Sequence, residues 1–551
     1  MIKTRIISSL EKVFPDSSLD KFKEVSALSA LRGERISVQL AYACESEGTL
    51  YVSRAPVTLG GSLAQYATVR AVDCVPVTMP THPQGYDDNY LRTSPGLYPD
   101  VLRPLYYGGE ISLHTHCTSA IWIEIQLPDG IKAGEHTLTV TVSSDTHGTE
   151  EKALAVEVID ALLPKEDIYF TQWFHADCLA NYYNVEVWSD KHWEIVENFA
   201  RVARKNGINM LLTPVFTPPL DTAVGGERRT TQLVGVTLRN GKYEFDFARL
   251  DRWVDMCDRC GIEYLEIAHL FTQWGAAHAP KIIVNVDGED RKLFGWHTDA
   301  HSEEYRAFVR SFISALLCHM RSRGDDKRMI FHISDEPSID HLESYRSAKE
   351  TVADLLDGYL IVDALSKIDF YKKGVLEHPV CSNNHIAPFL EEGVKGLWTY
   401  YCVSQPLLVS NRYMSMPGWR NRSIGMQMYK YGIEGFLHWG YNFYSNQFSG
   451  DPINPYLETS ADHAFPAGDS YSVYPSPDGT AYESTRLVVF YEALQDIKAM
   501  KLCESLYGHD AVVAAIEEEL GLTLTFDTCA KSSEKMMNVR ARINTMIRDK
   551  I

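Results

Sequence analysis

The most distinctive feature of the sequence is a pair of neighbouring carboxylates, Asp335 and Glu336, followed directly by Pro337. A proline favours extended backbone at the residue before it, and neighbouring side chains on extended backbone project to opposite sides. An ordinary retaining glycosidase places its acid and its nucleophile about 5 Å apart, on opposite faces of the sugar. Two neighbours on one strand approach a sugar from the same side, so they cannot enclose the reacting carbon in that way.

The same pair fits a different division of labour. Glu336 would protonate the departing glycosidic oxygen, which is general acid catalysis. Asp335 would hold a group beside the reacting carbon. If the sugar carries a 2-acetamido group, its carbonyl oxygen can attack C1, and a carboxylate that orients the amide N–H assists that attack. The alternative is a structural pair that caps the following helix, where Ser338 and Asp340 also suit a cap.

These carboxylates follow one of eight apolar segments that alternate with helical patterns up to about residue 507. Near-continuous apolar strands, each followed by a helix, are typical of a closed parallel barrel. We therefore predict an α/β barrel, a TIM-like (β/α)8 catalytic domain over residues 167–508. The expected strands are 168–175, 208–216, 262–270, 329–334, 359–365, 380–383, 395–403 and 433–443. The expected helices between them include 190–205, 250–260, 302–320 and 339–356.

The chain on either side of the barrel has other patterns. Residues 1–166 contain segments that alternate apolar and polar side chains with a period of two, notably 35–40, 120–127 and 136–142. Such alternation predicts an N-terminal antiparallel β-sandwich domain, in which each strand buries one face. Residues 509–551 have the pattern of a short helical C-terminal tail.

Insertions interrupt the barrel pattern. Two hairpins are expected, at 233–245 with a turn at Asn240-Gly241 and at 282–294 with a turn at Asp287-Gly288. Residues 445–482 follow the eighth strand and are rich in Pro, Gly, Asp and Tyr. A loop of that length is usually functional, so we expect it to cover the mouth of the barrel.

Barrel enzymes carry their reactive groups at the C-terminal ends of the strands, and this rule selects the candidate site residues. Aromatic rings stack on the C–H face of a pyranose, a tyrosine hydroxyl can place an acetamide carbonyl, and His or Asn can bind ring hydroxyls. Packing in the core is the competing interpretation for each of them. The candidates for substrate binding are Trp173, His175, Trp274, Tyr400, Tyr401, Trp439 and Asn442. His332 and His438 lie deeper on their strands and are expected to be core histidines.

Composition and missing motifs exclude several classes of function. The chain has 53 basic and 73 acidic residues, a formal net charge of −20, which disfavours nucleic acid and anionic membrane surfaces as partners. It has no GxGxxG, Walker, HExxH or GxSxG motif, and its one CxxC, at Cys257 and Cys260, lacks a second pair for zinc. No apolar run is long enough for a membrane helix, and residues 1–20 contain no apolar run of the length found in a signal peptide. We therefore expect a cytoplasmic protein, and the oligomeric state is left open. No metal and no organic cofactor are expected, because in the substrate-assisted reaction the substrate itself supplies the nucleophile.

The segment FHISDEP at residues 331–337 resembles the catalytic segment of glycoside hydrolase family 123. Four further segments are similar to that family: WFH at 173–175, YEFDFARLDRW at 243–253, GLWTYY at 396–401 and GFLHWGYN at 435–442. The resemblance extends from about residue 35 to residue 507. The family contains β-N-acetylgalactosaminidases with an N-terminal β-sandwich and a catalytic (β/α)8 barrel.

This resemblance implies a substrate-assisted, retaining mechanism through an oxazolinium intermediate, with Glu336 as the acid and Asp335 orienting the acetamide. The expected substrate is a glycan or glycoconjugate with a terminal N-acetylhexosamine, most simply β-linked N-acetylgalactosamine removed in an exo manner. Two alternatives stay open. One is a two-carboxylate retaining β-glycosidase with Glu336 as acid/base and Asp177 or Asp363 as nucleophile. The other is a non-catalytic glycan-binding protein, against which the presence of both Asp335 and Glu336 argues.

Overall fold

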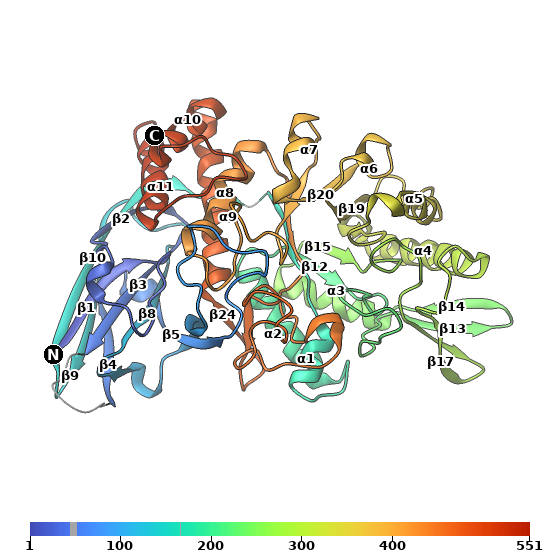
Figure 1. Ribbon diagram of the computed structural model, residues 1–551, viewed down its shortest axis with the longest axis horizontal. Coiled ribbons are helices and arrows are strands. Elements are labelled where there is room, and N and C mark those ends of the chain that lie inside the picture. The colour runs from blue at the N-terminus through green and yellow to red at the C-terminus, as the bar shows by residue number, and fades with distance from the viewer. Residues whose placement is uncertain (45–51, 166) are drawn as a thin grey trace.

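The computed structural model describes residues 1–44, 52–165 and 167–551, and it has two parts that lie side by side (Figure 1). The N-terminal strands form one part, and a barrel surrounded by helices forms the other. Helix α11 (Ser533–Arg548) lies beside the N-terminal strands and α10 (His509–Leu520) packs against it, so both chain ends are found in the first part.

The barrel is closed by eight strands within the described residues, and every pair of neighbours that it contains is parallel. The strands, in barrel order, are β11 (Tyr169–Gln172), β12 (Met210–Thr213), β15 (Tyr264–Ile267), β18 (Met329–Phe331), β19 (Leu360–Leu365), β20 (His378–Ser382), β21 (Trp398–Tyr400) and β22 (Gly435–His438). Each overlaps its predicted segment, so the predicted parallel barrel is confirmed. Most are shorter than predicted, because the chain bends into rim loops where the apolar pattern still continues.

Helices follow the barrel strands along the chain. They are α1 (Ala176–Tyr182), α2 (Asp190–Lys205), α3 (Ala248–Cys260), α4 (Glu303–Arg323), α5 (Leu342–Glu350), α6 (Asp369–Lys372), α7 (Ala387–Glu391), α8 (Gly418–Tyr431) and α9 (Thr485–Tyr507). Local sequence explains several boundaries: the Ser189 hydroxyl caps the start of α2, and Gly261 ends α3 with a positive φ of 76°. The helix predicted over residues 339–356 is too long at its C-terminal end. Helix α5 stops at Glu350, and the chain continues in hydrogen-bonded turns.

The two predicted hairpins are present and combine into one small sheet. They are β13 (Gly235–Arg239) with β14 (Lys242–Asp246), and β16 (Ile282–Val286) with β17 (Glu289–Phe294). Both turn residues of each hairpin have positive φ, as a tight two-residue turn requires. Parallel pairing of β13 with β16 joins the hairpins into a four-stranded sheet.

The N-terminal part consists of two sheets, and antiparallel pairs dominate both. The seven-stranded sheet contains β1 (Ile2–Ser8), β3 (Arg35–Cys44), β8 (Thr118–Gln126), β5 (Ala67–Val77), β6 (Gly96–Pro104), β24 (Ala481–Ser484) and β23 (Val473–Pro475). The five-stranded sheet contains β2 (Ala27–Arg32), β10 (Gly148–Leu162), β9 (Gly134–Ser144), β4 (Val52–Gly60) and β7 (Glu110–His114). Ile123 of β8 and Val140 of β9 share the core between the sheets, whereas Trp122 of β8 packs into the core that includes α9. The seven-stranded sheet is therefore buried on both faces.

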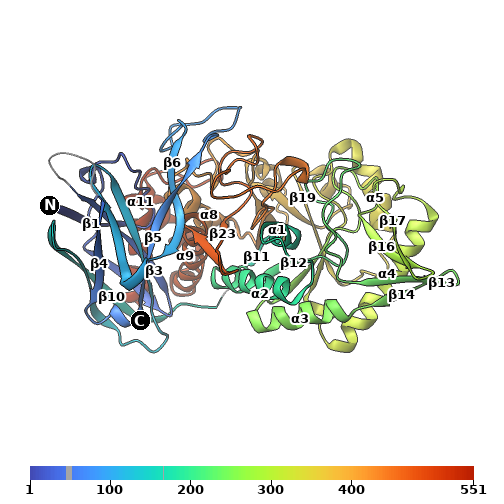
Figure 2. The same cartoon turned by 90° about the horizontal axis from the view of Figure 1, so that it is seen from below.

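The long segment after β22 connects the two parts of the molecule. Its last portion supplies β23 and β24, and β24 pairs with β6 of the N-terminal sheet. Figure 2 shows β23 at the junction between the N-terminal strands and the barrel. Helix α11 reinforces the junction from another side, since Arg540 forms ion pairs with Glu34 and with Asp496 of α9. Among the described residues, none of the helices combines the length and apolar character needed to span a membrane.

Candidate active site

A cavity of about 280 Å³ lies among the C-terminal ends of the barrel strands. Strand ends and rim loops from different parts of the chain contribute its walls, as the barrel fold dictates. Six of the nine predicted site residues meet there: Trp173, Trp274, Asp335, Glu336, Tyr400 and Trp439. Part of the long segment that follows β22 also lines the cavity, which supports the prediction that this segment covers the mouth.

The backbone at the carboxylate pair differs from the extended geometry expected before Pro337. Strand β18 ends at Phe331, and Glu336 has a positive φ of 41°. Two backbone hydrogen bonds hold this conformation: Glu336 N–H donates to the Ala364 carbonyl at 3.1 Å, and Trp274 N–H donates to the Asp335 carbonyl at 2.9 Å. The bend turns both carboxyls toward the same cavity instead of to opposite sides of a strand. A strained residue that is pinned in this way is typical of functional sites.

The two carboxyls have different environments. Asp335 is half-buried and Glu336 is exposed. Burial, and then the charge of Glu336, raise the pKa of Asp335 well above its ordinary value, although the nearby His332 opposes this. Among the described residues no side chain or backbone group donates a hydrogen bond to the Asp335 carboxyl. The Asp335 carboxyl lines the cavity, so it can accept a hydrogen bond from a bound molecule.

Tyr400 provides the one protein hydrogen bond to the Glu336 carboxyl in the described part of the chain. Its hydroxyl donates to Oε1 of Glu336 at 2.6 Å, and both side chains line the cavity. Burial, followed by the charge of Glu336, raises the pKa of Tyr400, so the hydroxyl stays protonated and acts as a donor. The other oxygen of Glu336 has no hydrogen-bond partner among the described residues.

Two tryptophans form fixed walls of the cavity. The indole N–H of Trp173 donates to Glu266 at 2.8 Å, and that of Trp439 donates to Asp469 at 2.9 Å. Burial raises the pKa of Asp469 to about 7, although Arg412 and Trp439 oppose the shift. Each ring thus has its orientation set by a buried carboxyl group, which leaves a ring face as a wall for a ligand.

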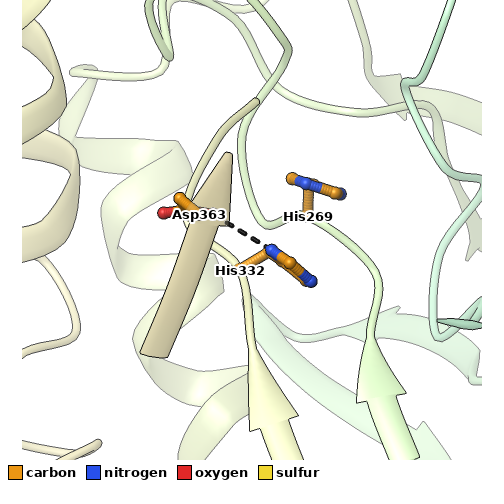
Figure 3. Close-up of side chains that lie close together, drawn as sticks. All are labelled: His269, His332 and Asp363. Carbon is orange, nitrogen blue, oxygen red and sulfur yellow. Dashed lines mark hydrogen bonds and ion pairs between the residues drawn. The ribbon is translucent and has the colours of Figure 1, made fainter. Parts of the chain in front are cut away.

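A sealed group of polar side chains lies in the barrel beneath this rim (Figure 3). His332 interacts through Nε2 with Glu266 at 2.7 Å and through Nδ1 with Asp363 at 3.1 Å. Burial alone would lower the pKa of His332, but its bonds to Asp363 and Glu266 raise it to about 10. His332 is therefore an imidazolium between two carboxylates, and its full burial agrees with the expected core position.

His269, His332 and Asp363 also place potential metal-ligand atoms within 4.8 Å of one another. The donor geometry fits a metal poorly. The two imidazole rings are stacked with centroids 4.4 Å apart and 22° between their planes, so their in-plane lone pairs do not converge on one point (Figure 3). Both nitrogens of His332 are already occupied by carboxylates. We interpret His332 with Glu266 and Asp363 as a hydrogen-bonded charge cluster, on which the ring of His269 stacks.

Comparison with known proteins identifies the family. Residues 173–503 match the family model described as glycoside hydrolase 123, catalytic domain, which covers more than half of the chain. The chain belongs to glycoside hydrolase family 123. No curated protein sequence matches it.

Solved structures support the fold of this family 123 enzyme. It is similar to a family 123 glycoside hydrolase from Clostridium perfringens, studied for glycolipid glycan hydrolysis, with a TM-score of 0.73, 14% identity, and coverage of 100% of this chain and 97% of that one. A Bacteroides ovatus GH5 xyloglucanase also matches, with a TM-score of 0.28, 8% identity, and coverage of 90% and 100%. Only the first similarity is close enough to show the fold.

Three predicted substrate-binding residues of the family 123 enzyme pack away from the cavity. His175 is buried and accepts a hydrogen bond from Arg228. The side-chain amide of Asn442 accepts a hydrogen bond from the backbone N–H of His175 and donates one to its backbone carbonyl. Tyr401 is fully buried, and its hydroxyl donates to Asn421 of α8. Tyr400 and Tyr401 are neighbours near the end of one strand, so only one of them can point to the cavity. These three side chains do not line the cavity and instead pack behind the residues that do.

The two proposed alternative nucleophiles are also engaged elsewhere. Asp177 is buried in a two-pronged ion pair with Arg228, with distances of 2.8 and 2.7 Å. Asp363 is sealed in the His332 cluster, where Tyr345 and the Ile333 N–H also donate to it. Neither carboxylate can attack a sugar in the cavity, because both are paired with other side chains and neither lines the cavity.

The sequence interpretation missed Asp221, a third carboxylate that lines the cavity. It lies in the loop after β12, where its carboxylate accepts the Phe448 N–H at 3.1 Å. Burial raises its pKa to about 6, although the Phe448 N–H and Arg228 oppose the shift. Its position shortly after the second strand was the available signal. Phe448 and Phe465 of the long loop were also missed, because nothing in the sequence shows which residues of a long loop turn inward.

Proposed function

We propose that this enzyme is a retaining exo-β-N-acetylgalactosaminidase that works by substrate-assisted catalysis. The observation that carries the proposal is that Asp335 and Glu336 face one cavity side by side, with Asp335 deeper and Glu336 nearer the solvent. A sugar in this cavity would present its 2-acetamido group to Asp335 and its glycosidic oxygen to Glu336. The galactosamine epimer is inferred from family membership, since this family contains β-N-acetylgalactosaminidases.

In the first step, the Asp335 carboxylate accepts a hydrogen bond from the amide N–H and orients the acetamide. The carbonyl oxygen attacks C1, while the bond from C1 to the glycosidic oxygen breaks and Glu336 transfers its proton to that oxygen. This step gives an oxazolinium ion and a free alcohol. In the second step, Glu336 removes a proton from water as the water attacks C1, which opens the ring with retained configuration and restores both carboxyls.

The electrostatics of the pair suit these roles. Burial and the charge of Glu336 raise the pKa of Asp335, so the empty site favours Asp335 in its neutral form. A substrate amide that donates to Asp335 stabilises its anion, which is the form that orients the acetamide. Tyr400 occupies only Oε1 of Glu336, so Oε2 is left for the proton that passes to the glycosidic oxygen. Substrate binding would thereby create the protonation state that the reaction needs.

The dimensions of the site support removal of one terminal sugar. A cavity of about 280 Å³ is near the lower end of ligand pockets, and the buried cluster seals the barrel beneath it. Trp173, Trp439 and Leu437 offer apolar surface for the sugar face and the acetamide methyl group. The Clostridium perfringens relative was studied with glycolipid glycans, which makes glycoconjugates with a terminal N-acetylgalactosamine the substrates to test first.

One observation favours a second candidate, a two-carboxylate retaining β-glycosidase. Asp221 lines the same cavity as Glu336 and could act as the nucleophile in place of the substrate. Its carboxylate is engaged by the Phe448 N–H, however, and it anchors the long loop. This partner makes a structural role the simpler account of Asp221.

The two candidates differ in their need for the 2-acetamido group. We expect kcat/KM for an aryl β-galactoside to be very low compared with that for the matching aryl N-acetyl-β-galactosaminide, because the galactoside carries nothing that attacks C1. The Asp221→Asn variant should still cleave the N-acetylated substrate. Comparable kcat/KM values for the two sugars, together with loss of activity in Asp221→Asn, would establish the two-carboxylate enzyme instead.

A further inference from the structure

We infer that Trp274 and Phe448 form a platform for the leaving sugar, the pyranose ring on the aglycone side of the bond that is cleaved. The inference rests on the proposed function, because it takes Glu336 as the acid. Each of the two aromatic side chains lines the cavity and is 40% exposed. Their rings meet edge to face, with centroids 6.0 Å apart and 88° between the planes. Exposed aromatic surface at the mouth of a cavity marks a binding surface.

The position of the acid determines which part of a substrate would reach these rings. Glu336 is the exposed member of the pair, and the oxygen that it protonates also carries the leaving group. Trp274 is attached to the same segment, since its N–H donates to the carbonyl of Asp335 at 2.9 Å. Trp173, in contrast, is only 3% exposed and lies at the closed end, where the terminal sugar would bind. The leaving group must extend outward, toward Trp274 and Phe448.

The platform is held in place before any ligand binds. Phe448 N–H donates to the Asp221 carboxylate at 3.1 Å, and the Ser449 hydroxyl donates to the Asp221 carbonyl at 2.7 Å. The loop that contains Asp221 is joined in turn to the Trp274 loop, because the Gln273 side chain donates to the Thr222 carbonyl at 2.9 Å. Three loops that follow three different barrel strands are thus locked together. Such preorganisation reduces the entropy lost on binding.

The backbone of both aromatic residues is in a conformation that bulky side chains rarely adopt. Trp274 has a φ of 57° and Phe448 a φ of 61°. Strained residues of this kind persist where the surrounding structure enforces them, and they cluster at binding and catalytic sites. Here the strain turns two large rings to the mouth of the cavity.

The polar groups around the rings favour a sugar as the occupant. Gln273, Gln447 and Asp221 line the same cavity, so amide and carboxylate groups surround the aromatic surface. A pyranose offers an apolar face to a ring and hydroxyls at its edge, which matches this combination. An alkyl chain would leave the polar groups without partners.

The test compares two substrates that both leave as alkoxides and so both need the proton of Glu336. One is a disaccharide of N-acetylgalactosamine β-linked to galactose, and the other is methyl N-acetyl-β-galactosaminide. We expect Trp274→Ala to lower kcat/KM for the disaccharide about tenfold, the size expected for loss of one ring contact, and to change that for the methyl glycoside little. Phe448→Ala should act in the same way, and Trp274→Phe should restore most of the loss. The control is Leu457→Ala, which removes a side chain of the same loop that is 69% exposed, and it should leave both substrates unaffected.

Several outcomes would overturn the platform. An equal loss on both substrates would mean that Trp274 acts only by supporting Asp335, and an unchanged disaccharide would place the leaving sugar elsewhere. An equal loss on octyl N-acetyl-β-galactosaminide and on the disaccharide would show a general apolar surface. If the wild-type enzyme cleaves none of these substrates, the proposed function fails and the platform fails with it. Calorimetry in the Glu336→Gln background gives a second readout, in which Trp274→Ala should weaken binding of the disaccharide and spare that of N-acetylgalactosamine.

Discussion

Two groups of carboxyls lie close together in this barrel, and they differ in how completely they are paired. Glu266 and Asp363 are fully buried, and an imidazolium at His332 joins them. Asp335 and Glu336 follow shortly after His332 in the chain, but the single hydrogen bond to their carboxyls from described residues comes from Tyr400. The same short stretch of sequence thus contributes to a satisfied cluster and to an unsatisfied pair.

We propose that this difference separates supporting groups from reacting groups. Buried charges are tolerated when they are paired and hydrogen-bonded, and the sealed cluster meets that condition. Groups that must bind or protonate a substrate need free hydrogen-bonding capacity, which the open pair retains. The comparison can be tested by removing one group at a time from each side.

The largest effect is expected for Glu336→Gln. A sugar alkoxide cannot leave without a proton, so kcat/KM for disaccharides should fall by about 10²–10⁴-fold, whereas nitrophenyl glycosides should suffer much less. The pH profile should also lose its basic limb, which reports loss of the acid's proton. Steady-state kinetics with both leaving groups test this assignment, and equal losses on both would contradict it.

A slightly smaller loss is expected for Asp335→Asn, and its pattern should differ. Asn cannot supply the negative charge that supports the oxazolinium, so kcat should fall about 10²–10³-fold with every leaving group. A better leaving group should give no comparable rescue. Near-normal rates of this variant on aryl N-acetyl-β-galactosaminides would disprove substrate-assisted catalysis.

On the sealed side, His332→Gln should act mainly on stability. Removing one partner of a buried ion pair costs about 3–5 kcal/mol in the free energy of unfolding. The matched control is His269→Leu, which removes the stacked neighbouring ring. Neither nitrogen of His269 has a hydrogen-bond partner among the described residues, so this change should cost less than about 1 kcal/mol or even stabilise the protein. Chemical denaturation followed by circular dichroism compares the variants, and similar losses in both would mean that the charge of His332 contributes little.

The smallest effect is a pH dependence of that stability difference. The pKa of His332 is about 10 in the folded protein, above the ordinary value of about 6.5 in the unfolded chain. Its protonation therefore contributes fully below about pH 6.5, and the contribution is lost as the pH rises toward 10. The difference in unfolding free energy between the wild type and His332→Gln should shrink over this window. A constant difference from pH 6 to pH 10 would argue that His332 is neutral when folded.

The sequence by itself determined the architecture and singled out the pair that we propose to react. Eight apolar segments with helical patterns between them specify a parallel barrel, because buried strands need apolar residues on both faces. The Asn-Gly and Asp-Gly turns specified two hairpins, since these residues tolerate positive φ. Asp335 and Glu336 were found because the chemistry of two adjacent carboxylates at a strand end is unusual in itself.

Only the tertiary structure decided which neighbouring residues face the cavity. Tyr400 reaches Glu336 while Tyr401 bonds to Asn421 of a helix, a choice made by how the end of β21 turns within the barrel. The bend at Glu336 depends on hydrogen bonds to Ala364 and Trp274, which come from distant parts of the chain. Local preference before Pro337 predicted extended backbone, and these long-range bonds overrode it. The role of a residue at the rim is set by such contacts, and the pattern of its own segment does not contain them.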